Sequence, residues 1–211
     1  MGSCYGICTM ILAVSILILE VGVIVHLLVY TVLTGISPVP TTPRVRLKML
    51  EAAPGEVEGM ILDLGSGWGS LAFAFARKYP RSRVVGYELS PIPWCFCLVR
   101  LWLRPQPNLA FRRIDFHKAP FKQAGLIVCY LFPGGMHELR PKLERELNAG
   151  CLVISNTFSV PGWGSDRIHV ADDQYATPVY VYAMNHKGPS AQTSDPEPLS
   201  KWCSLVGELY S

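Results

Sequence analysis

The longest apolar run in the chain lies near its N-terminus. From about Thr9 to Leu33 nearly every residue is apolar, and Glu20 and His26 are its most polar positions. A helix of about 25 residues, rising about 1.5 Å per residue, is longer than the hydrocarbon core of about 30 Å. The run also lacks the basic leading region and small-residue cleavage site of a signal peptide. The pattern therefore predicts a transmembrane helix.

Charge on either side of this run predicts its orientation. No Lys or Arg precedes it, whereas Arg44, Arg46 and Lys48 follow. Basic residues are enriched on the cytoplasmic side of membrane helices, so we expect the rest of the chain to lie there. Within the span, Glu20 has two interpretations: a contact with another membrane helix, or a single polar residue tolerated by a strongly apolar helix.

Beyond the span, short apolar runs alternate with helix-like runs. Strands are expected at 60–64, 83–88, 109–114, 126–131, 151–156 and 177–184, and helices at 43–53, 70–78, 91–104 and 136–148. Buried strands separated by helices indicate an α/β fold, with a parallel sheet covered on both faces. The last run, Thr177 to Met184, alternates in polarity and should close an edge of the sheet.

Composition divides the chain into three parts. We expect an N-terminal segment with the transmembrane helix (1–36), one α/β domain (37–184) and a polar, Pro- and Ser-rich tail (185–211). With 211 residues, half of them apolar, the chain can bury one sizeable core. The helix expected at 91–104 is apolar nearly all round. Either the segment around 35–50 covers it, or it lies against the bilayer.

A glycine-rich turn follows the first strand of the domain. Asp63 is followed by Gly65, Gly67 and Gly69, and a helix-like run begins directly afterwards. Glycines at such a turn let the backbone approach a ligand where a Cβ atom would clash. Glu88 ends the next strand, at a spacing that suits a carboxylate binding ribose hydroxyls. Strand, turn, helix and second acid together predict a nucleotide-like ligand.

In open α/β sheets, ligands bind outside the carboxyl ends of the strands. The residues expected there to bind the ligand are Asp63, Gly65, Ser66, Gly67, Glu88, Leu89, Asp115 and Phe116. Asp115 can accept a hydrogen bond from an adenine amino group, and Phe116 or Leu89 can pack on the ring. Further along this edge, the residues expected to line a channel for a second substrate are Tyr130, Asn156, Phe158 and Trp163. No residue stands out as a catalytic acid, base or nucleophile.

The pattern D-x-G-x-G-x-G resembles motif I of class I S-adenosylmethionine-dependent methyltransferases, a Rossmann-like fold. From Val39 to Trp163 the chain is similar to membrane-anchored members, namely the mitochondrial protein-lysine methyltransferases that modify the ADP/ATP carrier and the ATP synthase c-ring protein, and to bacterial relatives. The stretches that carry this resemblance are 39–42, 62–67, 86–91, 131–133, 153–156 and 161–163. The resemblance implies S-adenosylmethionine as cofactor and N-methylation of a protein lysine at the membrane.

Composition narrows the alternatives. The net charge of +3 comes from scattered residues and does not indicate nucleic-acid binding. Seven cysteines without a C-x-x-C pair fit reduced thiols, and no cluster of acids predicts a metal site. Two other functions stay open at this point. One is methylation of a small apolar or lipid-like molecule that enters from the bilayer. The other is a cofactor-binding scaffold without catalysis.

Overall fold

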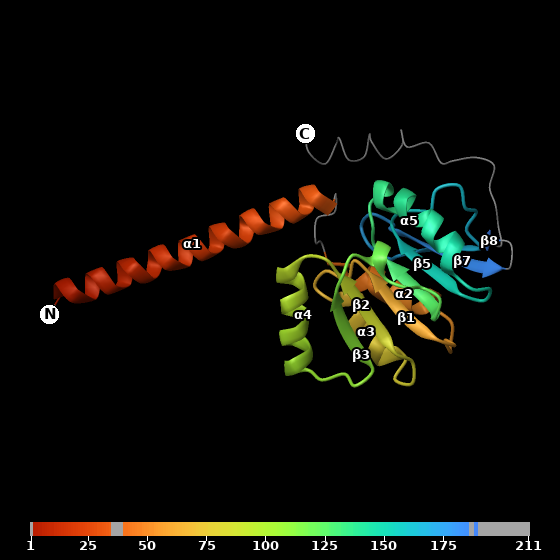
Figure 1. The fold of residues 1–211 in the computed structure, drawn as a ribbon, viewed down its shortest axis with the longest axis horizontal. Helices are drawn as coiled ribbons and strands as arrows, with labels where there is room; N and C mark the ends of the chain where they lie inside the picture. Colours follow the sequence, from red (N-terminus) through yellow and green to blue (C-terminus); the bar gives the residue numbers. More distant parts are fainter. Residues whose placement is uncertain (1, 35–39, 186–187, 190–211) are drawn as a thin grey trace.

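The computed structural model describes residues 2–34, 40–185 and 188–189 of the chain (Figure 1). The first helix, α1, spans Gly2–Thr34. Within it, Thr9–Thr31 has a mean hydropathy of 2.7, and no part of its most apolar window is buried. By length and composition this helix can cross a membrane. Part of the Pro-rich segment that follows, and most of the polar tail expected at 185–211, lie outside the described residues.

The remaining elements form one mixed sheet with helices on both faces, as expected (Figure 1). The strands are β1 (Met60–Leu64), β2 (Val84–Glu88), β3 (Leu109–Arg113), β4 (Ala124–Cys129), β5 (Leu152–Asn156), β6 (Arg167–Val170), β7 (Pro178–Asn185) and β8 (Gly188–Pro189). Their order is β3-β2-β1-β4-β5-β7-β6, and β8 also pairs with β7. Strands β1 to β5 are parallel. The order reverses between β1 and β4, which is where such sheets bind ligands.

Two apolar layers hold the helices to the sheet. The helices are α2 (Pro43–Ala52), α3 (Ser70–Lys78), α4 (Pro91–Leu103), the short 3₁₀ helix η1 (Phe116–Lys118) and α5 (Pro133–Glu146). One layer packs α2, α3 and α4 on the face that presents Ile61. The other packs α5 and the segment before β4 on the face that presents Leu62. Neighbouring strand residues thus enter opposite layers, which explains the continuous apolar runs of the parallel strands. Among the described residues, neither layer includes any part of α1.

Helix α2 begins as predicted. The side chain of Thr42 accepts a hydrogen bond from the backbone N–H of Val45 at 3.4 Å, and Pro43 occupies the first helical position. The helix packs on α3 and on the β5, β7 and β6 side of the sheet. The outward side chains of α4 stay exposed. In the described part of the chain, the segment around residues 40–50 therefore does not cover α4.

Two predicted elements were placed wrongly. The strand at 178–185 is not an edge strand, because the four-residue strand β6 pairs with it on its outer side. Strand β6 is too short, and too exposed at three of its four residues, to give a clear pattern. Helix α5 begins at Pro133, three residues earlier than expected. Proline favours the first helical position, and this preference outweighs the two glycines that follow it.

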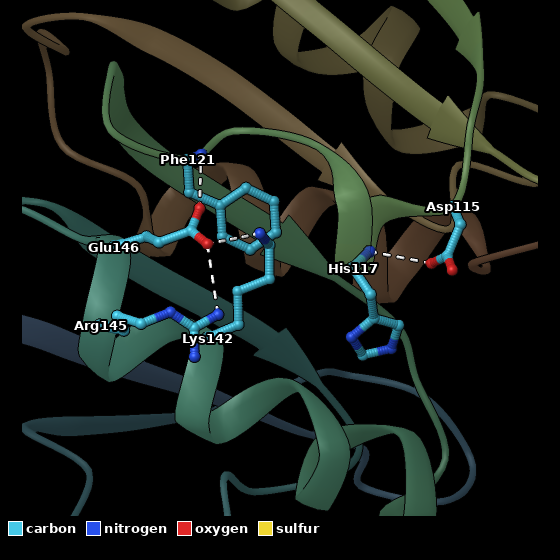
Figure 2. A network of polar contacts seen from close by, with 6 residues as sticks. All are labelled: Asp115, His117, Phe121, Lys142, Arg145 and Glu146. Atoms are coloured by element: carbon cyan, nitrogen blue, oxygen red, sulfur yellow. Dashed lines mark hydrogen bonds and ion pairs between the residues drawn. The ribbon is translucent and has the colours of Figure 1, made fainter.

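A buried ion pair joins α5 to the segment that leads into β4 (Figure 2). Lys142 is 7% exposed, and its ammonium lies 2.7 Å from the carboxylate of Glu146. The same carboxylate accepts a hydrogen bond from the backbone N–H of Phe121 at 3.2 Å, and the ammonium lies over the Phe121 ring. Burial alone would raise the pKa of Glu146, but these hydrogen bonds outweigh it and hold the pKa below its usual value. The pair fixes residues 115–124 against α5.

Replacing Glu146 with alanine should lower the free energy of unfolding by about 2 kcal/mol, because it leaves a buried ammonium and a backbone N–H unpaired. That loss corresponds to a melting temperature lower by roughly 4–8 °C in a chain of this size. The matched control is Glu138→Ala, which removes an exposed carboxylate from the same helix. Thermal unfolding of both variants checks the prediction. Equal melting temperatures would show that the ion pair does not stabilise the fold.

Candidate functional site

The glycine turn lies at the carboxyl end of β1, beside the point where the strand order reverses. Gly65, Gly67 and Gly69 all have positive φ angles, of 69°, 50° and 75°. A Cβ atom on Gly69 would lie 2.9 Å from the sulfur of Cys97, so packing requires that glycine. A Cβ atom on Gly67 would have its nearest neighbour at 4.0 Å. The turn therefore leaves open space on the Gly67 side, where a ligand can approach the backbone.

Asp63 joins β1 to the helix after the turn. Its side chain is 2% exposed, and it accepts a hydrogen bond from the backbone N–H of Ala72, in the first turn of α3, at 2.9 Å. Burial raises the pKa of Asp63 to about 7. The hydrogen bond from Ala72 opposes this shift, and the nearby carboxylate of Glu88 adds to it. A protonated Asp63 is thus favoured in the folded chain at mildly acidic pH.

The raised pKa predicts a pH dependence of stability. The unfolded chain releases the Asp63 proton near pH 4 and the folded chain near pH 7, so the folded state binds the proton more tightly between these values. The free energy of unfolding should therefore fall by about 2 kcal/mol as the pH rises from about 5 to about 7. Denaturant titrations at several pH values check this. Asp63→Asn keeps an oxygen for Ala72 and should lack this fall, and identical pH profiles for the two proteins would contradict the assignment.

Glu88 ends β2, and its carboxylate clamps the turn. One oxygen accepts a hydrogen bond from the backbone N–H of Gly67 at 2.7 Å, and the other accepts one from the N–H of Ser90, also at 2.7 Å. Each carboxylate oxygen has a second lone pair, so both can still accept a bond from a ligand hydroxyl. The residue can therefore position the turn and bind a ribose at once. The sequence predicted only the second role.

Ser66 shows that this turn fits a polar ligand. Its hydroxyl oxygen is buried, and it has no hydrogen-bond partner within the described chain. Its backbone N–H, by contrast, donates to the carbonyl of Tyr87 at 2.8 Å. A buried hydroxyl without a partner costs stability, and a ligand with polar groups would satisfy it. The open side of Gly67 and the oxygens of Glu88 flank the same turn, which fits an amino acid and a ribose within one cofactor.

The residues expected to bind adenine follow two neighbouring strand ends. Glu88 pairs in register with Arg113, so Leu89 and Asp115 lie just beyond adjacent strands. The carboxylate of Asp115 accepts a hydrogen bond from the backbone N–H of His117 at 2.9 Å and caps η1 (Figure 2). Leu89 is 41% exposed, and Phe116 is half-buried. The placement suits an adenine ring, and the contact itself stays a prediction.

On the other side of the turn, aromatic side chains meet at the ends of β4 and β5. The rings of Tyr130 and Phe158 are stacked, with centroids 6.4 Å apart. Between the strand end and Phe158, Thr157 has a φ of 67°, which a β-branched residue rarely adopts. Two hydrogen bonds hold this turn: the hydroxyl of Thr157 donates to the side-chain oxygen of Asn156, and that of Ser155 donates to the carbonyl of Phe158. Backbone strain of this kind is found most often at functional sites.

Trp163 does not reach this mouth. It is 4% exposed and packs edge-on against Tyr182 in the core, with ring centroids 5.6 Å apart. Its indole N–H donates to the carboxylate of Glu144 on α5 at 2.9 Å. The expectation that Trp163 lines a channel for the second substrate was therefore wrong. The indole is a packing residue whose polar edge is already paired.

Sequence reasoning missed a second clamp on the glycine turn, made by α4. The thiol of Cys97 donates to the carbonyl of Gly67 at 3.2 Å, and the guanidinium of Arg100 donates to the carbonyl of Trp68 at 3.1 Å. Arg100 also lies over the ring of Phe73, 4.2 Å from its centre. Cys97 and Arg100 are three residues apart, so they share one side of the helix. That spacing was visible in the sequence, but their common partner was not.

Comparison with known proteins agrees with this geometry. Residues 63–167 match the ANTKMT methyltransferase domain family. The chain is 28% identical over 152 residues to a protein-lysine N-methyltransferase of Saccharolobus islandicus, covering 71% of this chain and 94% of the relative. It is 35% identical over 111 residues to the human lysine N-methyltransferase of the ATP synthase c-ring protein, covering 52% of this chain and 47% of the relative. The chain thus spans nearly all of the Saccharolobus relative and about half of the human one.

A crystal structure described as an RNA methyltransferase from Salinibacter ruber, in complex with S-adenosyl-L-homocysteine, has the same fold. It is 28% identical, covers 76% of this chain and all of the other, and superposes with a TM-score of 0.64. This fold match confirms the Rossmann-like methyltransferase sheet, and the bound product indicates S-adenosylmethionine as the cofactor. The chain carries an ANTKMT methyltransferase domain and belongs to the S-adenosylmethionine-dependent methyltransferases.

Proposed function

We propose that this enzyme transfers a methyl group from S-adenosylmethionine to the side-chain nitrogen of a lysine in a protein held at a membrane. The observation that carries the proposal is the family match, because residues 63–167 include both the glycine turn and the Tyr130–Phe158 pair. Relatives at both coverages carry names that specify protein lysine as the acceptor. The same match argues against a cofactor-binding scaffold without catalysis.

The chemistry asks little of the protein beyond alignment. S-adenosylmethionine supplies an electrophilic methyl group, and the lysine nitrogen forms a bond to that carbon as its bond to sulfur breaks. Orientation of the two groups and exclusion of water account for such a reaction, so no covalent enzyme intermediate is needed. The absence of an evident nucleophile in the sequence is consistent with this mechanism.

A lysine must arrive at the site neutral, although its pKa in water is about 10.4. Apolar and aromatic surroundings favour the neutral amine, because burial disfavours the charged form. The stacked rings of Tyr130 and Phe158 supply such a surface at the strand ends, and the strained turn at Thr157 holds Phe158 in place. In this proposal, Tyr130, Phe158 and the side-chain amide of Asn156 line the acceptor channel.

The N-terminal helix supports a membrane location. Thr9–Thr31 can cross a membrane, and the basic residues Arg44, Arg46 and Lys48 follow it without counterparts before it. The proposed organisation is a single-pass anchor in residues 1–36, a methyltransferase domain in 37–184 on the cytoplasmic side, and a tail in 185–211. Protease added to sealed right-side-out vesicles should leave the domain intact. Its digestion would show the opposite topology.

Labelled methyl groups test the acceptor class. The full chain is incubated with native membranes and S-adenosylmethionine that carries a labelled methyl group, and the label is then measured in protein, in solvent-extracted lipid and in RNA. We expect the label in membrane protein. Label in the lipid fraction would favour a small apolar acceptor, label in RNA would favour the acceptor named for the Salinibacter structure, and no transfer would favour a scaffold. Each of these other results would overturn the proposal.

A further inference from the structure

Helix α4 presents an exposed apolar face. Trp102 is 79% exposed, Leu103 65% and Val99 55%, and the other exposed members of this face are Cys95, Phe96 and Leu98. At 100° per residue, all six lie within one half of the helix, and none of them is charged. The opposite side contains Cys97 and Arg100, which hold the glycine turn. This outer side, called the α4 face below, belongs to the helix that supports the cofactor site.

An arginine cluster flanks the α4 face. It consists of Arg100 and Arg104 of α4 with Arg77 of α3 and Arg46 of α2. Burial is the largest cause that lowers the pKa of Arg100, and the charges of Arg77, Arg104 and Arg46 lower it further, so the four groups lie within electrostatic reach. In the described part of the chain, no carboxylate forms an ion pair with any of them. The cluster is therefore a surface of uncompensated positive charge.

We propose that the α4 face lies on a bilayer that contains anionic lipids, with the arginine cluster among the headgroups. A helix with an apolar face bearing tryptophan, beside basic residues, has the composition of interfacial helices. Anionic lipids attract arginines placed near the membrane surface. The proposal rests on the membrane location proposed above: α1 can cross a bilayer, and the described domain resumes only six residues after α1 ends.

This contact would orient the site as well as hold it near the membrane. Helix α4 connects the parallel strands β2 and β3, so it runs back along the sheet beside β3 (Figure 1). With α4 flat on the bilayer, the strands lie roughly parallel to the surface. The carboxyl edge of the sheet, which carries the cofactor turn and the Tyr130–Phe158 pair, then faces along the membrane. An acceptor lysine a short distance above the bilayer would meet the open site.

Tryptophan quenching in reconstituted vesicles tests the contact. The full chain is placed in vesicles of phosphatidylcholine and phosphatidylserine with bromine on the lipid acyl chains near the headgroup, and tryptophan fluorescence is compared with that in unbrominated lipid. The variants are Trp102→Phe on the α4 face and, as the matched control, Trp94→Phe, whose half-buried ring packs toward the core. We expect Trp102→Phe to abolish most of the quenching by lipid and Trp94→Phe to leave it in place. Pure phosphatidylcholine should reduce the quenching of Trp102.

Each other result would overturn the proposal. Equal quenching with and without Trp102 would show that the α4 face does not touch lipid. Quenching of Trp102 that appears only after removal of residues 190–211 would mean that the chain's own tail occupies this face. Crosslinking between copies without quenching would assign the face to a second copy. The readout needs neither cofactor nor acceptor. A chain that fails to float with vesicles refutes the proposed anchor, whereas a chain that floats with Trp102 unquenched refutes the α4 contact alone.

Discussion

Replacing Glu88 with alanine should weaken binding of S-adenosylmethionine by roughly 5- to 150-fold, which corresponds to about 1–3 kcal/mol for unpaired polar groups. The carboxylate accepts the backbone N–H groups of Gly67 and Ser90, and it is the expected partner of the ribose hydroxyls. Its removal therefore loosens the turn and leaves the ribose without its acceptor. Isothermal titration calorimetry with the full chain measures the loss. Glu56→Ala, which removes an exposed carboxylate elsewhere, should bind as the native chain does.

A second pair of variants separates ligand contact from backbone strain. Gly67 and Gly150 both have positive φ and open space where a Cβ atom would stand. Valine at either position introduces a similar strain, but only Gly67→Val places its side chain on the proposed cofactor side. We expect cofactor affinity to fall in Gly67→Val and to stay unchanged in Gly150→Val. Native affinity in both Gly67→Val and Glu88→Ala would refute the assignment of the cofactor site.

Removing residues 1–36 should leave cofactor affinity nearly unchanged while methylation of acceptors in native membranes falls by roughly 100-fold or more. The anchor confines the enzyme and a membrane-held acceptor to the same surface, which raises their effective concentration without adding a contact at the site. Both apolar layers of the domain lie within residues 45–184, so the deletion removes no described residue of its core. Initial rates with native membranes and calorimetry with cofactor check the two halves of this prediction.

The control restores the anchor without its sequence. A chain with Thr9–Thr31 replaced by an unrelated apolar helix of the same length should methylate membrane acceptors as the native chain does. If only the native helix restores the rate, α1 makes specific contacts, for which Glu20 would be the first candidate. If the truncated chain methylates membranes as fast as the full chain, the anchor does not act by confinement.

The sequence was most informative where one residue type has few structural alternatives. Strand β1 and helix α3 have the predicted bounds, because a buried strand, three glycines and an uninterrupted helix-forming run leave little choice of conformation. The start of α2 was also predicted, since Thr42 followed by Pro43 specifies a helix start through local hydrogen bonding and a fixed φ. These local signals sufficed to identify the cofactor turn and Glu88.

Features that depend on distant partners could not be predicted in this way. Strand β6 forms because β7 offers it an unpaired edge, and its own four residues carry almost no pattern. The burial of Trp163 depends on Tyr182 and Glu144, which come from two other elements. The hydrogen bonds from α4 to the glycine turn likewise join residues about 30 positions apart. Such contacts arise from packing between elements, which a single sequence does not encode visibly.

Identification of the methylated atom tests the central claim most directly. Membrane protein labelled by the full chain is hydrolysed to amino acids, and the labelled species is identified by chromatography and mass spectrometry, with Glu88→Ala run in parallel. The account predicts that the label is found in N-methylated lysine and that Glu88→Ala reduces it strongly at limiting cofactor. Label confined to another amino acid, or no label in protein at all, would contradict it.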